Sequence, residues 1–272
     1  MANTAVQMLY DKHTGAEAAV FGGVVQPFPQ HFHDYYVIGI TESGARRLNC
    51  GSAVYLLQRG AVNVFCPGTS HACADITPGA FYHKSFNLPA ALVEVLLPDS
   101  FNGFGSVVLY DTELFKNLSF WHTAFWQTES AAVRRSLLVK IITALAQASS
   151  SSNLPEHADS AQILNAACRF IKSNYSRRLS TEEICRACGV SASTLLRCFA
   201  AEGITPQRYL TAVRINKACQ ILQNGGSLTA AALANAFNDQ SHFTNTFTKI
   251  MGVTPKAYSK LFLQRGGHFF DS

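Results

Sequence analysis

Residues 237–258 read FNDQSHFTNTFTKIMGVTPKAY, and this stretch decides the fold of the 272-residue chain. Its last seven residues, GVTPKAY at 252–258, repeat GITPQRY at 203–209. The apolar residues that precede each of these two segments also repeat, at nearly the same separation in the sequence. Self-similarity at a fixed spacing is the signature of a duplicated structural unit. The sequence therefore predicts two copies of one supersecondary element in its C-terminal part.

Each copy is expected to form a helix, a tight turn and a second helix. The segments are residues 181–188, 189–191 and 192–202 in the first copy, and residues 228–235, 236–239 and 240–251 in the second. Small residues in the turns let the helices cross closely, as in a helix-turn-helix. Ser180 and Glu183 form a capping box at the start of the first copy. Ser191 and Asp239 can cap the second helix of each copy, which leaves free backbone N–H groups where a phosphate could sit.

The outward faces of the second helices suit contact with DNA bases. Leu195 and Phe199 point inward in the first copy, as Phe243 and Phe247 do in the second. The outward candidates are Ser193, Thr194, Leu196 and Arg197 in the first copy, and Gln240, Ser241, Thr244, Asn245 and Lys249 in the second. Arginine suits guanine, whereas glutamine and asparagine suit adenine. The alternative is a helical bundle whose polar faces meet only water.

Charge divides the chain near residue 160. Residues 1–160 carry 9 Lys and Arg against 12 Asp and Glu, and residues 161–272 carry 13 against 5. The net charges are −3 and +8. An acidic part followed by a basic part favours a sensor joined to a binder of polyanions.

The first 110 residues are expected to form short strands separated by turns. The predicted strands are residues 35–41, a hairpin over 46–57, and residues 61–66 and 81–88. Glycine and proline punctuate them, which is typical of a β-sandwich or barrel.

Two amphipathic helices and a linker are predicted to follow. The apolar faces are Leu114, Leu118, Trp121 and Phe125, then Leu138, Ile141, Ile142 and Leu145. These helices could cover the open side of the barrel or pair with a second subunit. The predicted domains are a barrel (1–112), a helical pair (113–148), a Ser-rich linker (149–160) and a DNA-binding domain (161–265).

The segment FNDQSHF at 237–243, followed by Phe247 and GVTPKAY, resembles the signature of the AraC/XylS family of regulators. The resemblance covers residues 161–262. It implies seven helices, a long one near 206–223, and recognition helices in successive major grooves about 34 Å apart. It also implies a homodimeric activator that contacts RNA polymerase. Cys185 stands where the family has a small residue. Ala236 stands where the family has a turn glycine, and this replacement costs stability if φ is positive at that position.

Residues 27–89 resemble the cupin-like barrel that often precedes this module, through PFPQHFH at 27–33 and PGTSH at 67–71. The resemblance implies a small-molecule effector bound inside the barrel. The candidate effector-binding residues are His31, His33, Tyr35, Tyr55, His71 and Tyr82.

His31, His33 and His71 could also gather one metal ion, because imidazole is a common ligand. A cupin metalloenzyme would add a carboxylate soon after the second histidine, and Val37 stands near that place. We therefore expect no catalytic residues, bound metal or cofactor. The alternatives are a cupin-type metal-dependent enzyme with a nucleic-acid module, and a regulator whose N-terminal domain only dimerises.

The N-terminus has no basic segment followed by an apolar run, and the helix over 136–148 is too short to span a membrane. We expect a reduced, cytoplasmic protein. Cys185 and Cys188 lack two further ligands nearby, so inward packing is expected for this isolated CxxC.

Overall fold

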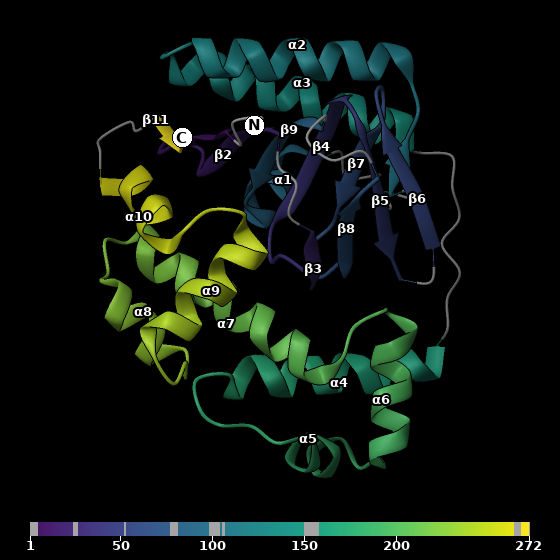
Figure 1. Cartoon of the computed structure of the whole chain (residues 1–272). Helices are drawn as coiled ribbons and strands as arrows, with labels where there is room; N and C mark the ends of the chain where they lie inside the picture. Colours follow the sequence, from purple (N-terminus) through teal and green to yellow (C-terminus); the bar gives the residue numbers. More distant parts are fainter. Residues whose placement is uncertain are drawn as a thin grey trace.

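The computed structural model describes residues 5–23, 27–51, 53–76, 81–97, 104, 107–149, 158–263 and 268–271. An N-terminal half (described residues up to 149) is rich in strands, and a C-terminal half (158–263) is helical (Figure 1). The predicted combination of a β-rich domain and a helical domain is confirmed.

The strands form two antiparallel sheets. The seven-stranded sheet has the order β10-β7-β4-β9-β2-β1-β11, and the four-stranded sheet has the order β3-β8-β5-β6. The strands are β1 (Ala5–Asp11), β2 (Ala16–Gly22), β3 (Phe28–His31), β4 (Tyr36–Ser43), β5 (Ala45–Cys50), β6 (Ala53–Gln58), β7 (Val62–Phe65), β8 (His71–Asp75), β9 (Tyr82–Leu88), β10 (Val108–Leu109) and β11 (His268–Asp271). The predicted strands correspond to β4, β5 with β6, β7 and β9.

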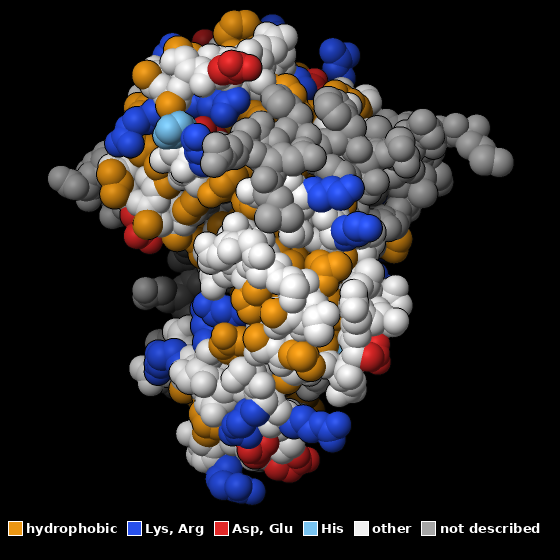
Figure 2. All heavy atoms as spheres, turned by 90° about the vertical axis from the view of Figure 1, so that its left-hand side faces the viewer, with side chains coloured by type: hydrophobic (Ala, Val, Ile, Leu, Met, Phe, Trp, Pro, Cys, Tyr) orange, Lys and Arg blue, Asp and Glu red, His pale blue; other side chains and the backbone are white. Residues whose placement is uncertain are grey.

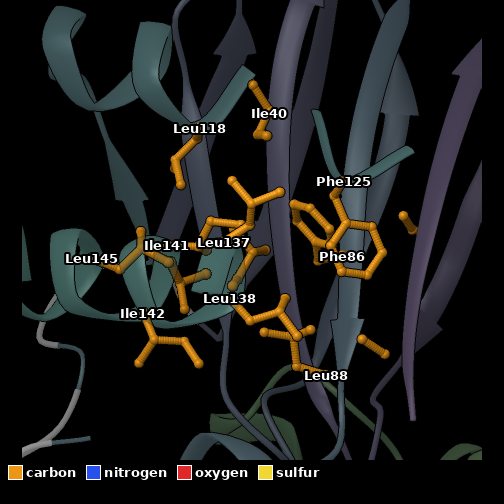
Figure 3. Close-up of a cluster of buried hydrophobic side chains, with 14 of the residues drawn as sticks. Ile40, Phe86, Leu88, Leu118, Phe125, Leu137, Leu138, Ile141, Ile142 and Leu145 are labelled. Atoms are coloured by element: carbon orange, nitrogen blue, oxygen red, sulfur yellow. The ribbon is translucent and has the colours of Figure 1, made fainter. Parts of the chain in front are cut away.

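Three helices accompany the sheets: α1 (Ala90–Leu96), α2 (Thr112–Gln127) and α3 (Ala131–Ser149). Leu118 and Phe125 of α2 pack with Leu138 of α3 against Ile40 and Phe86 of the larger sheet (Figure 3). Arg134 of α3 also reaches the buried carboxylate of Asp11 on β1, at 3.2 Å. The two predicted amphipathic helices therefore cover one face of this sheet.

The C-terminal half contains seven helices within the described residues, as the family resemblance implied. They are α4 (Ala158–Asn174), α5 (Thr181–Cys188), α6 (Ala192–Ala201), α7 (Pro206–Gln223), α8 (Leu228–Ala234), α9 (Gln240–Met251) and α10 (Pro255–Leu263). Of the predicted linker, residues 150–157 lie outside the described residues, while Ser149 and 158–160 are helical.

The two halves share buried apolar side chains. Val6 and Met8 of β1 belong to the same core as Phe247 and Met251 of α9. Phe32, which follows β3, stacks on Tyr209 of α7 with ring centroids 4.4 Å apart. Strand β11, from the far end of the sequence, pairs with β1. The second helix-turn-helix unit and helix α7 are thus packed against the N-terminal half.

Across the described residues, no single helix has the length and apolar character needed to cross a membrane. The bent pair α5 and α6 taken together is long and apolar enough, by length and composition only.

Two histidines lie at the larger sheet: His122 of α2 is buried on the face that α2 covers, and His83 of β9 is half-buried on the opposite face. The Nε2 atom of His122 lies 3.2 Å from the carbonyl oxygen of Ser85 on β9. Burial, the main cause, lowers the pKa of His122 to about 4 and that of His83 to about 3.

Acidification below pH 6.5 is expected to destabilise the protein. Above this pH both rings are neutral in the folded and unfolded states, so their full contribution is present. Below it the unfolded chain takes up protons that the folded chain does not accept until about pH 4 or 3. Between pH 6.5 and its pKa in the folded state, each histidine lowers the free energy of unfolding by up to about 1.4 kcal/mol per pH unit.

Urea denaturation at pH 7.5, 6.5 and 5.5 checks this expectation. His122→Gln should lessen the fall in unfolding free energy between pH 6.5 and 5.5. An unfolding free energy that stays constant over this interval would contradict the assignment.

Candidate nucleic-acid interface and buried cavity

The first helix-turn-helix unit is formed by α5 and α6. The Ser180 side chain accepts from the Glu183 backbone N–H at 3.2 Å, and the Glu183 carboxylate accepts from the Ser180 N–H at 2.9 Å. Gly189 ends α5 with a φ of 66°, and Ser191 caps α6 by accepting from the Thr194 N–H. The two helices are inclined at 94°, within the usual range for this motif.

The outward face of α6 carries the residues expected to meet DNA. Ser193, Leu196 and Arg197 are exposed, whereas Thr194 is half-buried beside the Ser191 cap. On the other side, Leu195 is fully buried in the unit's core.

The second unit, α8 and α9, repeats this arrangement. The Asp239 carboxylate caps α9 by accepting from the His242 N–H at 2.7 Å. Phe243 and Phe247 are fully buried. Of the candidate DNA-binding residues, Gln240, Ser241, Asn245 and Lys249 are exposed and Thr244 is half-buried.

Helix α7 holds the two units apart. Thr205 caps it, Pro206 opens it, and ten of its residues are buried. At about 1.5 Å per residue, its 18 residues span about 27 Å. Figure 2 shows Lys and Arg side chains dispersed over the helical half, with a few acidic side chains near its lower end.

Ala236 departs from ideal geometry in the turn of the second unit. Its φ is +53°, and it is the only residue other than glycine with a positive φ in the part of the chain that the structure describes. The strain expected from the missing turn glycine is therefore present.

A cavity of about 120 Å³ lies within the N-terminal half. Of the candidate effector-binding residues, His31, His33, Tyr35 and His71 line it. Tyr55 instead packs against the cluster around Leu48, and Tyr82 is 39% exposed.

Sequence reasoning missed several lining residues. His83, Ser85 and Asn87 occupy alternate positions of β9 and point into the cavity, whereas Tyr82 is on the other face. The two-residue period of this strand was the available signal. Asn63 also lines the cavity, in the space left by Gly39, where a Cβ would collide with its side chain.

The cavity combines apolar walls with a buried positive charge. The Arg46 guanidinium lies 5.2 Å from the centroid of the Phe28 ring and 4.7 Å from that of Phe81. An anionic group with a small apolar body would suit these surroundings.

Helix α9 contributes to the same cavity. Ile250 and Met251, in its last turn, line the wall that faces the C-terminal half. The helix that presents Gln240 and Asn245 at its start thus closes the cavity at its end. No pattern in the sequence indicated this contact, because both residues also read as ordinary core positions of the helix.

A buried carboxylate joins the halves beside a second cavity of about 360 Å³. Glu17 on β2 accepts from the Tyr258 hydroxyl at 2.8 Å and from the side-chain amides of Gln223 and Asn87 at 3.2 and 2.9 Å. Burial raises the pKa of Glu17, and these three donors oppose that rise. We call these four residues the Glu17 cluster.

Two family descriptions match the chain. Residues 22–187 match an AraC-like ligand-binding domain, and residues 184–261 match a helix-turn-helix domain. The chain is 31% identical over 252 residues to the uncharacterized HTH-type transcriptional regulator YbfI of Bacillus subtilis, covering 89% of this chain and 90% of that protein. It is 25% identical to the HTH-type transcriptional activator RhaS of Klebsiella pneumoniae, covering 84% and 86% respectively.

Solved structures of ToxT from Vibrio cholerae share the fold. An apo ToxT variant gives a TM-score of 0.58 at 15% identity, covering 91% of this chain and 97% of that one. Wild-type ToxT with a bound unsaturated fatty acid gives 0.55 at 15% identity, covering 98% of each chain. At these identities the likeness concerns the fold alone.

Replacing the strained alanine tests the turn geometry. Ala236→Gly should raise the unfolding free energy by about 1 kcal/mol, because glycine adopts positive φ without strain. Ala230→Gly, at an exposed position inside α8, is the control and should lower it by about 0.5–1 kcal/mol. Urea denaturation measures both, and destabilisation by Ala236→Gly would show that this φ carries no strain.

Proposed function

The chain belongs to the AraC family of transcriptional regulators, and we propose that it reads DNA with both helix-turn-helix units while its cavity senses a small molecule. The observation that carries this proposal is that α9 contributes both to the candidate DNA-binding surface and to the cavity wall. Its first turns expose candidate base contacts, and its last turn closes the cavity through Ile250 and Met251.

In the proposed DNA complex, α6 and α9 enter successive major grooves on one face of the duplex. Arg197 reads a guanine, and Gln240 or Asn245 reads an adenine. The remaining contacts come from Ser193, Thr194, Leu196, Ser241, Thr244 and Lys249. The net charge of +8 over residues 161–272 supports attraction to phosphates.

The proposed effector is a small organic anion. ToxT is described as bound to an unsaturated fatty acid, but the cavity here, at about 120 Å³, is smaller than one known to hold benzene at about 150 Å³. Arg46 supplies the positive charge for an acidic group. His31, His33, Tyr35 and His71 remain the candidate lining residues, and Tyr55 and Tyr82 are the weaker candidates because they lie outside this cavity.

Effector binding is proposed to act through α9. A ligand that presses on Ile250 and Met251 favours an arrangement in which this helix leaves the cavity, provided that the ligand binds that arrangement more tightly. The change would alter how the two units engage DNA and, with the protein acting as an activator, how it contacts RNA polymerase.

The proposed division of the chain is a ligand-binding part (1–112), a helical pair (113–148), a linker (149–160) and a DNA-binding part (161–265). Formation of a homodimer through the helical pair is supported by exposed apolar side chains. Phe120 on α2 is 69% exposed, and Val133 and Val139 on α3 are 45% and 39% exposed.

Footprinting on DNA upstream of the protein's own and neighbouring genes tests the DNA-binding proposal. Protection of about 17–20 base pairs per subunit is expected, because two units in adjacent grooves span nearly two turns. Protection should weaken steeply as salt rises. Asn245→Ala should raise the Kd for the protected site about 5- to 150-fold, the value of one base contact.

Gln58→Ala, on an exposed position of β6, is the matched control and should leave the Kd unchanged. Absence of specific protection at low salt by a folded protein would refute the proposal, as would equal Kd values for Asn245→Ala and the control.

Charge placed on the exposed apolar surface of α2 tests dimerisation. Phe120→Glu should shift the sedimentation profile from dimer to monomer, because a carboxylate is costly to bury in an apolar interface. Val95→Glu on α1, where Val95 is 74% exposed, is the control for loss of an exposed apolar side chain. A dimer that persists in Phe120→Glu, or a monomeric wild type, would contradict this interface.

A further inference from the structure

Three histidines meet in the cavity wall. His31 ends β3, His33 follows two residues later, and His71 begins β8. All three are buried, with exposed fractions of 3%, 9% and 4%. One ring nitrogen from each lies within 4.8 Å of the others, and this is the one such group among the described residues.

Hydrogen bonds orient two of the rings. The Nδ1 atom of His31 donates to the carbonyl of Pro29 at 2.7 Å, and Nδ1 of His71 donates to that of Thr69 at 3.0 Å. A backbone carbonyl oxygen can only accept, so each of these bonds requires a proton on Nδ1. A neutral ring protonated on Nδ1 has a free lone pair on Nε2. Metal-binding histidines are held by backbone carbonyls in this way.

The third ring lacks a protein partner for one nitrogen. Nδ1 of His33 is buried and has no hydrogen-bond partner among the described residues. The His33 ring lies 4.8 Å from that of His31 and 5.3 Å from that of His71, measured between centroids. Buried polar atoms without a partner are uncommon in folded proteins and call for an explanation.

The sequence alone led us to expect no bound metal, but the geometry of the three rings favours one. We propose that His31, His33 and His71 bind one divalent first-row transition metal ion, with zinc as the best fit to three imidazole ligands. Three atoms no more than 4.8 Å apart can all lie within about 2.8 Å of one point, and zinc–nitrogen bonds are about 2.0–2.1 Å long. Shifts of under about 1 Å would therefore complete the site.

The charge of the surroundings determines the remaining ligand. Val37 supplies no carboxylate near the position expected for a cupin metalloenzyme. Three neutral imidazoles leave the charge of the ion uncompensated, so an anion takes the open position. Hydroxide can fill it, and under the proposed function the acidic effector can fill it as well.

Cobalt(II) titration of the full-length, chelator-treated protein tests the site directly. We expect one Co²⁺ per chain, with visible d–d bands of a low-symmetry site, displaced by one equivalent of Zn²⁺. The eight free cysteines are a competing source of ligands. A near-ultraviolet thiolate charge-transfer band would identify them and overturn the assignment to histidines.

Ligand variants provide the second readout. His33→Ala should weaken Co²⁺ binding by at least about 100-fold, since losing a ligand exceeds the 10- to 100-fold cost of losing an outer partner. His71→Gln, which keeps a polar side chain of similar size, should do the same. His83→Ala is the matched control, because His83 lines the same cavity outside the cluster.

Circular dichroism and cooperative urea unfolding establish that each variant is folded before it is titrated. Unchanged Co²⁺ affinity in folded His33→Ala or His71→Gln, or absence of stoichiometric binding by the wild type, overturns the proposal. These measurements use neither DNA nor effector. A failed metal site therefore leaves the footprint result standing, and a failed footprint leaves the metal result standing.

Discussion

The burial of one carboxylate constrains how the two halves of the chain can be arranged. Glu17 sits on β2 with almost no contact with solvent, and its donors come from three other elements. Tyr258 belongs to α10, Gln223 to α7 and Asn87 to β9. A buried carboxylate without such donors is strongly disfavoured, so all three elements must be in place together. That requirement positions α7 and α10, and with them α9, against the sheets.

The position of α9 links the two sites through a single rigid element. Its 12 residues begin at the Asp239 cap, where the candidate base contacts are exposed, and end at the wall of the cavity. Displacement of Met251 therefore moves Asn245 with it. The proposed coupling needs no long chain of side chains, because both sites would bias the position of the same helix.

The helix-turn-helix units could be predicted closely because their signals are local. The Ser180–Glu183 capping box, the prolines that open α7 and α10, and the duplicated GxTP segment each act over a few residues. The seven helices followed from the family resemblance. The contact between the halves could not be predicted, because Val6, Met8 and Met251 read equally well as core residues of their own domains. Likewise, the face of β9 depends on register, and a one-residue error selects Tyr82 in place of His83.

The mixed core also limits how regulators of this kind can exchange parts. A hybrid joined at the linker would set the β1 and β2 side chains of one parent against the α9 side chains of another. Val6 and Met8 would then meet residues that did not evolve beside them, and interiors packed to crystal-like density tolerate such mismatches poorly. Viable recombinants would need to inherit β1 and β2 together with the second helix-turn-helix unit, although most of the chain separates them. The two functions are assigned to separate segments of the chain, but these segments cannot be exchanged independently between relatives.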